Sequence, residues 1–306
     1  MPIETGTPAN DLYNIVLRTL IEPYIYYGAE GDDIFAVYQN VPRLNVSGTN
    51  SSGDLSQNQT DTLQLFVSAD FESIRAMDAL VFASNGGDKT FTAGISSFYT
   101  FTHITGSATP EANTIKISTA SEPIDLDMSE VVFTNWGRAN QTILVEMNTN
   151  AAEINDDRFV GSAAGERVTA GNGRDLLYGN AGDDYLDGGD GIDVLDGGEG
   201  NDTLLGGGGE GPNILKGSNG NDVYKFNEKV DIIVDTGGLD SRMVSKTTTM
   251  SSKDKLEGLA ADEAAGGKSI NLTGNAKANL LVGHAGKNSL KGMNGNDIVE
   301  GRLGND

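Results

Sequence analysis

The chain has 306 residues, and its 44 acidic and 21 basic residues give a formal net charge of −23. This charge argues against nucleic acid or an anionic membrane as the main partner, because both attract a basic surface, and it favours cations. The absence of cysteine excludes disulfides and thiolate metal sites, and two histidines cannot supply a histidine-rich zinc site. The 41 glycines, with only 7 prolines and no three-residue period, indicate many tight turns rather than collagen.

The N-terminal segment, residues 1–39, is expected to be degenerate and repeat-like. Residues 28–35 match one row of the glycine and aspartate pattern described below, but a lone row has no stacked partner, so calcium binding there stays open. The first residues lack the basic and apolar regions of a secretory signal. No apolar run approaches the ~20 residues that span a bilayer, so we expect a soluble chain with no membrane span. The last residues stop partway through a repeat, which favours a fragment.

Residues 40–150 are predicted to form a β-rich spacer domain. Short segments of alternating polarity, separated by polar and glycine turns, are typical of strands; they lie at residues 62–67, 79–82, 114–117, 131–134 and 143–146. An irregular β-solenoid is the first expectation and a β-sandwich the second. Residues 71–79 are the only stretch predicted to be helical, and the Ser, Asn and Gly-rich residues 40–60 are predicted to form a mobile loop.

The middle of the chain is a nonapeptide repeat. From Ala170 it can be written in rows of nine with the pattern G-G-x-G-x-D-x-U-x, where U is a large apolar residue. The sixth positions are Asp175, Asp184, Asp193, Asp202, Asn213 and Asp222. In this alignment the fifth row is Gly208–Lys216, with Gly206 and Gly207 as two inserted residues.

The repeat pattern requires successive rows to stack on one another. Each row has one obligatory apolar side chain in a strand of three residues, which cannot bury its face unless rows stack. If two rows make one coil, Asp193 follows Asp175 by 18 residues and lies next to it. The same register stacks two apolar series, Leu177, Leu195 and Leu215 on one side and Val168, Leu186, Leu204 and Tyr224 on the other.

The stacked aspartates predict a cation site. Two carboxylates in one turn repel each other unless a cation lies between them. Carboxylates and backbone carbonyls together form a cage of hard oxygen ligands, and a cage of about 6–8 oxygens at about 2.3–2.6 Å suits Ca²⁺ better than Mg²⁺, which holds its water. No soft ligand favours zinc or copper.

These rows resemble the RTX, or hemolysin-type, calcium-binding repeat. The resemblance implies a parallel β-roll with Ca²⁺ held in rows along both edges, so the expected fold is all-β: a β-roll or β-solenoid of nonapeptide repeats flanked by irregular β-solenoid-like spacers. It also implies that each ion takes oxygens from two turns one coil apart. Carried over by position, the metal ligands would be Gly171, Gly173, Asp175, Gly188, Asp190 and Asp193 in one site; Asn180, Gly182, Asp184, Gly197, Glu199 and Asp202 in the next; and Gly198, Gly200, Asp202, Gly217, Asn219 and Asp222 in a third. A weaker fourth site would use Gly189, Gly191, Asp193, Gly208, Glu210 and Asn213.

The expected organisation follows from these rows. Residues 151–226 would form the calcium-binding β-roll, residues 227–272 a spacer, and residues 273–306 a second, truncated block. The second block has Asn279 and Asn288 at sixth positions and Asp297 at the last, so its metal affinity should be lower and its rows mainly structural.

The favoured function is calcium binding that drives the folding of a secreted bacterial protein, or of a fragment of one, and the resemblance implies extracellular localisation after export by type I secretion machinery. No catalytic site is expected, because the chain has no H-E-x-x-H and no G-x-S-x-G motif. Three alternatives remain: a small secreted carbohydrate-active enzyme or a part of one, a calcium-dependent adhesin, and a surface-layer protein.

Overall fold

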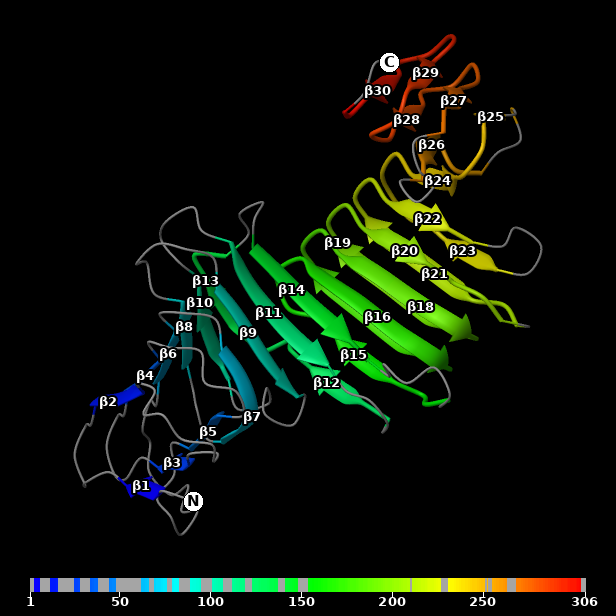
Figure 1. Cartoon of the computed structure of the whole chain (residues 1–306). Helices are drawn as coiled ribbons and strands as arrows, with labels where there is room; N and C mark the ends of the chain where they lie inside the picture. Colours follow the sequence, from blue (N-terminus) through cyan, green and yellow to red (C-terminus); the bar gives the residue numbers. More distant parts are fainter. Residues whose placement is uncertain are drawn as a thin grey trace. The chain divides into compact units, whose positions relative to one another are not determined.

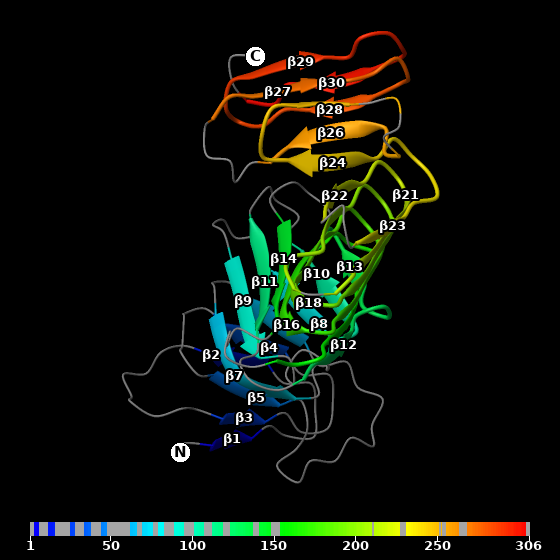
Figure 2. The same cartoon turned by 90° about the vertical axis from the view of Figure 1, so that its right-hand side faces the viewer.

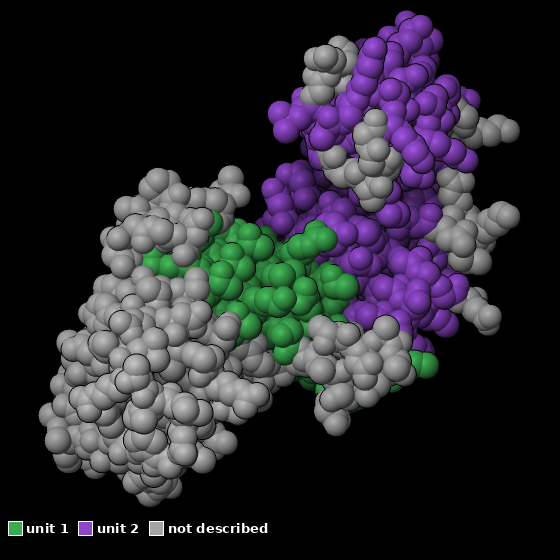
Figure 3. All heavy atoms as spheres, in the orientation of Figure 1, with its two compact units in different colours: residues 1–169 green, residues 170–306 purple. Residues whose placement is uncertain are grey.

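The computed structural model describes residues 101–106, 112–118, 123–136, 141–147, 154–209, 211–226, 231–250, 252, 255–262 and 268–303. Of residues 1–100 it describes the strands, together with the side chains of Leu80 and of residues 89–92. Within this part of the chain every regular element is a β-strand, and the strands pair in parallel. No helix in it is long and apolar enough to cross a membrane. The chain forms two compact units, residues 1–169 and 170–306, which Figure 3 colours separately.

The first unit is a parallel β-solenoid (Figure 1). Its strands are β1 (Ile3–Thr5), β2 (Leu12–Ile15), β3 (Ile25–Tyr27), β4 (Ile34–Val37), β5 (Leu44–Ser47), β6 (Thr62–Leu65), β7 (Ala69–Arg75), β8 (Ala79–Phe82), β9 (Lys89–Gly94), β10 (His103–Thr105), β11 (Asn113–Ser118), β12 (Asp125–Asp127), β13 (Val132–Thr134), β14 (Gln141–Glu146) and β15 (Arg158–Val160). One sheet has the order β1-β3-β5-β7-β9-β11-β14 and another β2-β4-β6-β8-β10-β13. From β1 to β11, consecutive strands therefore lie in opposite sheets, as in a coil that winds in one direction.

Apolar side chains stack along the inside of this unit. Phe91, Ile115 and Ile143 are in register on three neighbouring strands, and all three are fully buried. Each such side chain contributes about 1.5–3 kcal/mol when it leaves water. Buried and partly buried residues alternate along β11, and the parallel sheets confirm the β-solenoid expected for residues 40–150.

Two expectations within residues 40–150 are wrong. Residues 71–79 were predicted to be helical, but β7 (Ala69–Arg75) is a strand and β8 begins at Ala79. The loop expected over residues 40–60 contains β5 (Leu44–Ser47). In both places the pairing of each strand with the coils before and after it outweighs local preference, because a strand gains all its backbone hydrogen bonds from neighbouring coils. The single row at residues 28–33 lies outside the described residues.

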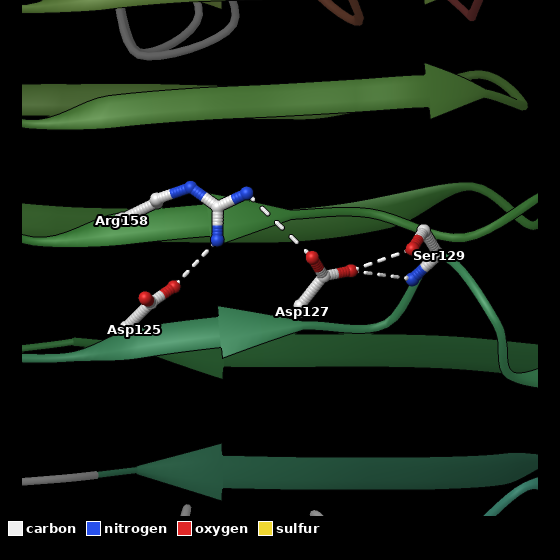
Figure 4. A network of polar contacts seen from close by, with 4 residues as sticks. All are labelled: Asp125, Asp127, Ser129 and Arg158. Atoms are coloured by element: carbon white, nitrogen blue, oxygen red, sulfur yellow. Dashed lines mark hydrogen bonds and ion pairs between the residues drawn. The ribbon is translucent and has the colours of Figure 1, made fainter.

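The carboxylates on the outer face of the first unit are neutralised by the chain itself. Arg158 on β15 reaches across to β12, where its guanidinium lies 2.6 Å from Asp125 and 3.6 Å from Asp127 (Figure 4). The backbone N–H and the hydroxyl of Ser129 both donate to Asp127 (Figure 4). These Ser129 hydrogen bonds, followed by the charge of Arg158, hold the pKa of Asp127 below its usual value.

The second unit continues the parallel pairing. β16 (Glu166–Gly173) spans the boundary, and the later strands are β17 (Leu176–Ala181), β18 (Tyr185–Gly191), β19 (Val194–Glu199), β20 (Thr203–Leu205), β21 (Ile214–Asn219), β22 (Val223–Lys225), β23 (Ile232–Val234), β24 (Ser241–Val244), β25 (Thr248–Thr249), β26 (Gly258–Ala261), β27 (Ile270–Thr273), β28 (Leu280–Val282), β29 (Asn288–Lys291) and β30 (Ile298–Glu300). One sheet has the order β18-β20-β22-β24-β26-β28-β30, and the two others are β17-β19-β21-β23 and β25-β27-β29 (Figure 2).

The core of the repeat rows has the predicted register. On one side Leu177 pairs with Leu195, which pairs with Leu215, and on the other Leu204 lies between Leu186 and Tyr224. All six side chains are fully buried. One apolar residue per row therefore builds a continuous core, which places the sixth-position residues, two positions earlier, in the turns along the two edges.

Glycine is needed in these turns both because the backbone has positive φ and because a side chain would collide with the preceding coil. Gly200 has a φ of 134°, which L-residues rarely adopt, and a Cβ there would lie 2.0 Å from the carbonyl oxygen of Gly182 in the preceding coil. By contrast, a Cβ on Gly237 would find no atom closer than 3.7 Å, and its φ is not in the left-handed region.

We therefore expect Gly200→Ala to lower the free energy of unfolding by about 1–3 kcal/mol, since both the backbone strain and the clash fall on the stacked coils. Gly237→Ala is the matched control and should change it by less than about 1 kcal/mol. Urea unfolding in saturating Ca²⁺ measures both. Equal effects from the two substitutions would contradict the close coil contact.

Candidate metal centre

The sixth-position residues form two ladders of hydrogen bonds, one along each edge of the roll. In each rung, a side-chain Oδ1 accepts the backbone N–H of the sixth residue one coil earlier. One ladder runs through Asp175, Asp193, Asn213 and Asp231, with N···O distances of 3.0, 2.8 and 3.0 Å. The other runs through Asp184, Asp202, Asp222 and Asp240, with distances of 2.9, 2.8 and 2.7 Å.

The second carboxylate oxygen has no protein partner on four rungs. Among the described residues, Oδ2 has no hydrogen-bond partner in Asp193, Asp202, Asp222 and Asp240, and these side chains are at most 1% exposed. Buried carboxylates are normally paired or bound to a metal, because an uncompensated charge away from water is costly. These four oxygens therefore need a cation that the described part of the chain does not supply.

The first glycine of each row holds this oxygen in place. A Cβ on Gly197 would lie 2.0 Å from Oδ2 of Asp202, and a Cβ on Gly217 would lie 1.9 Å from Oδ2 of Asp222. In these two rows a larger first residue would require the carboxylate to move. Glycine at the first position therefore leaves room for the carboxylate.

Burial shifts the titration of these acids. It raises the pKa of Asp202 to about 7 and the pKa values of Asp193 and Asp222 to about 6, while the backbone N–H on Oδ1 lowers them by a smaller amount. Neighbouring acids raise the same values further. The nearby Lys216 does not pair with these acids: its Nζ lies 2.7 Å from Oδ2 of Asp196.

The residues present fit Ca²⁺. The donor set consists of carboxylates and turn carbonyls, which are the oxygens that Ca²⁺ prefers, with no sulfur or imidazole among them. The carbonyls of Glu199 and Asn219 each accept a backbone hydrogen bond at 2.9 Å, from Gly182 and Gly200, which leaves a second lone pair on each oxygen.

The structure brings together the turns that contain the predicted ligands, although the coordination of each ion stays a prediction. The sixth-position pairs Asp175 with Asp193, Asp184 with Asp202 and Asp202 with Asp222 are each joined by a rung of a ladder. The second and fourth positions of these rows have positive φ, at Gly171, Gly173, Asn180, Gly182, Gly189, Gly191, Gly198, Gly200, Ser218 and Gly220.

The fifth row has a different register from the predicted one. Asp190 pairs with Gly208 in an isolated parallel bridge, and a Cβ on Gly207 would lie 1.8 Å from the carbonyl oxygen of Gly189. The row therefore begins at Gly206, and the two extra residues lie between Gly209 and Asn213 instead of before Gly208. Four consecutive glycines fit either alignment in sequence, and only the coil contact distinguishes them. Gly208 is thus a third-position residue, opposite Asp190.

The ladders also extend beyond residue 226, where the sequence predicted a spacer. Asp231 follows Asn213 by 18 residues and Asp240 follows Asp222 by 18, and both accept the expected backbone N–H. Their rows, 226–234 and 235–243, lack most of the glycines of the motif, so the row pattern missed them. The 18-residue spacing of the aspartates alone would have found them.

Asparagine occupies the same position and satisfies the turn without an ion. Nδ2 of Asn213 donates to the carbonyl oxygen of Gly206 at 2.6 Å, where the aspartate rows have Oδ2. In the C-terminal block, Nδ2 of Asn279 donates to Glu257 and Nδ2 of Asn288 donates to Ile270, both at 2.9 Å. The amide thus replaces the missing cation with a hydrogen bond, which supports the structural role predicted for these rows.

Comparison with known proteins agrees with this geometry. The family model described as the RTX calcium-binding nonapeptide repeat matches the chain in four copies, at residues 160–195, 184–211, 208–225 and 273–306. No curated protein matches the chain. The chain therefore carries RTX repeats, as its rows of nine predicted, and these repeats imply calcium binding. Asp231 and Asp240 lie outside every matched segment.

Replacing a ladder aspartate with asparagine should stabilise the metal-free roll and reduce the stabilisation that Ca²⁺ adds. In Asp202→Asn we expect more β-structure in the presence of a chelator than in the wild type, because the amide can donate where Oδ2 has no partner. The gain in unfolding free energy on adding Ca²⁺ should shrink, by about 1–3 kcal/mol. Far-UV circular dichroism and urea unfolding, with chelator and with Ca²⁺, measure both.

Glu130→Gln is the control for Asp202→Asn, because it removes the same charge from an exposed side chain outside the ladders. It should leave both quantities near their wild-type values. An equal response in the two variants would mean that the effect comes from net charge alone.

The raised pKa values predict that acid partly replaces calcium. Because the folded-state pKa values of Asp193, Asp202 and Asp222 lie above the ordinary 3.8, the folded chain binds more protons than the unfolded chain between about pH 4 and pH 7. Without metal, its stability should therefore rise as the pH falls through 7 and 6. As the pH falls over the same range, the Ca²⁺ concentration for half-maximal folding should rise, because protons compete with Ca²⁺ for the carboxylate ligands.

Circular dichroism at a series of pH values, with chelator and with a Ca²⁺ titration at each pH, tests this. A metal-free signal that weakens on acidification through this window is the behaviour of carboxylates with lowered pKa values, and it would contradict the burial of these acids.

Proposed function

We propose that the repeat rows of this chain are a calcium-dependent folding module of an exported protein, in which Ca²⁺ bound between successive coils drives formation of the roll. The single observation that supports this proposal most strongly is the set of buried, unpartnered Oδ2 atoms of Asp193, Asp202, Asp222 and Asp240. They make the metal-free roll electrostatically unfavourable, and an ion between them removes that cost.

Charge explains why metal and folding are coupled. At a net charge of −23, self-repulsion opposes the compact state, and the acids of the ladders are the ones that folding brings together. The ligands of one site come from two coils and are far apart in an extended chain. The free energy of metal binding therefore becomes free energy of folding.

The same coupling suits secretion. A chain that stays expanded at the low free Ca²⁺ of a bacterial cytosol can pass through an export channel, and it then folds in the Ca²⁺-rich medium outside. We therefore propose an extracellular location reached through type I secretion machinery, as the RTX rows suggest. The proposed role is structural and non-catalytic, because the buried acids are used by the fold and do not converge on a substrate.

A Ca²⁺ titration followed by circular dichroism tests the coupling. We expect a transition from coil to β-structure in the intact chain, and a shift of that transition to about tenfold or more higher Ca²⁺ in Asp193→Ala plus Asp202→Ala, which removes one carboxylate from each ladder. Glu130→Ala plus Glu300→Ala is the control: it removes the same charge from exposed side chains outside the ladders.

The proposal fails if the metal-free chain already shows the full β spectrum and a chelator does not alter its thermal unfolding. It also fails if both double variants shift the transition equally, because the ladder positions would then have no special role.

A further inference from the structure

Three carboxylates meet at one edge of the second unit, beyond the last matched RTX row. Asp222 is the sixth residue of row 217–225, and Asp235 and Asp240 are the first and sixth residues of the row one coil later. One ligand oxygen from each lies within 4.8 Å of the others. In rows 179–187, 188–196, 197–205 and 217–225 the first position is glycine, which has no side chain to offer, so Asp235 adds a carboxylate where these rows have only a carbonyl.

The two buried acids of the cluster, Asp222 and Asp240, lack a positively charged partner among the described residues. Asp222 and Asp240 are fully buried, and their Oδ2 atoms have no hydrogen-bond partner. Oδ1 of Asp240 is already used by the backbone N–H of Asp222 at 2.7 Å. Within the described residues no lysine or arginine pairs with the three acids; Lys225, close to Asp222 in the chain, lies 3.2 Å from Asp262 instead.

Tyr224 lies beside this cluster. Its hydroxyl accepts the backbone N–H of Gly217 at 2.9 Å and donates to Oδ1 of Asp235 at 3.4 Å. Burial, and then the charges of Asp222, Asp235 and Asp240, raise the pKa of this hydroxyl, so all three acids are close enough to act on it. A Cβ on Gly217 would lie 1.9 Å from Oδ2 of Asp222 and 2.2 Å from the Tyr224 hydroxyl oxygen.

The cluster is open on one side. Asp235 is exposed, while Asp222 and Asp240 are buried, and Asp235 also lines a pocket of about 450 Å³ together with Asp231 and Lys255. Asp235 is therefore the acid of the cluster that solvent reaches.

We propose that Asp222, Asp235 and Asp240 bind a divalent cation of the calcium type, in a site with three carboxylates that joins row 217–225 to row 235–243. The proposal rests on the calcium binding proposed above for the ladders, and it adds a site that the RTX pattern does not assign. Three oxygen ligands of formal charge −1 suit a hard cation, and Ca²⁺ accepts the irregular arrangement of such a cluster more readily than Mg²⁺. With one more charge than a pair of sixth-position aspartates, this site should bind Ca²⁺ more tightly than the matched rows do.

Isothermal titration calorimetry of the full chain with Ca²⁺ tests the site directly. Asp235→Asn removes the added carboxylate and leaves every ladder rung intact, so we expect it to lose one ion per chain from the tightest class, or to weaken that class about tenfold or more. Glu130→Gln is the control with the same change of charge at an exposed side chain outside the ladders, and it should titrate like the wild type.

Tyr224 provides a second readout that does not depend on the folding of the Asp235 variant. Tb³⁺ binds to oxygen sites of the calcium type and emits when a nearby tyrosine absorbs light. The first equivalent of Tb³⁺ should be sensitised in the wild type and displaced by Ca²⁺. In Tyr224→Phe most of this first-equivalent emission should disappear, while calorimetry still records the tight Ca²⁺ site.

The outcomes separate this inference from the proposed function. If the wild type binds no Ca²⁺, the proposed function fails and this site fails with it. If the wild type binds Ca²⁺ and Asp235→Asn has the same stoichiometry and affinities, only the site with three carboxylates is overturned. The site is also overturned if Tyr224→Phe leaves the emission of the first Tb³⁺ equivalent unchanged.

Discussion

The roll depends on one unbalanced interaction: each buried aspartate has two oxygens, and the protein gives a partner to only one of them. Oδ1 accepts a backbone N–H from the coil before, which fixes the register between coils. Among the described residues, Oδ2 has no donor on Asp193, Asp202, Asp222 and Asp240, and on the first three it lies against a first-position glycine. The same side chain therefore aligns the coils and makes their stacking unfavourable until a cation is present.

Asparagine shows what the chain does when no ion is needed. At Asn213, Asn279 and Asn288 the amide nitrogen donates to a backbone carbonyl, so the turn is satisfied by the protein alone. Aspartate and asparagine are nearly equal in size and can occupy the same turn. In the proposed function, the choice between them would decide, row by row, where folding requires metal and where it does not.

Sequence predicted the parts of this fold that repeat. One apolar residue per nine gave the stacks of Leu177, Leu195 and Leu215, and the spacing of the aspartates gave the ladders. The prediction from sequence failed where the sequence allowed two alignments, or where contacts between coils decided the structure. Four consecutive glycines hid the start of the fifth row at Gly206, and β7 is a strand because neighbouring coils pair with it, which no local preference reports. The rows that contain Asp231 and Asp240 lack most of the glycines of the motif, although they keep the 18-residue spacing.

The loss of glycine in the last rows has a physical meaning. Glycine at the first position leaves room for a neighbouring carboxylate, and the ion is then shared between two sixth-position acids. After Asp240 the ladder changes character, because Ser241 pairs with Gly258 and Asn279 occupies a later turn through its amide. A turn at the end of an aspartate ladder lacks the acid that a further coil would supply. Asp235, at the first position of the same row as Asp240, supplies a third carboxylate from within the row, and the cation proposed to bind there would compensate the last acid of the ladder.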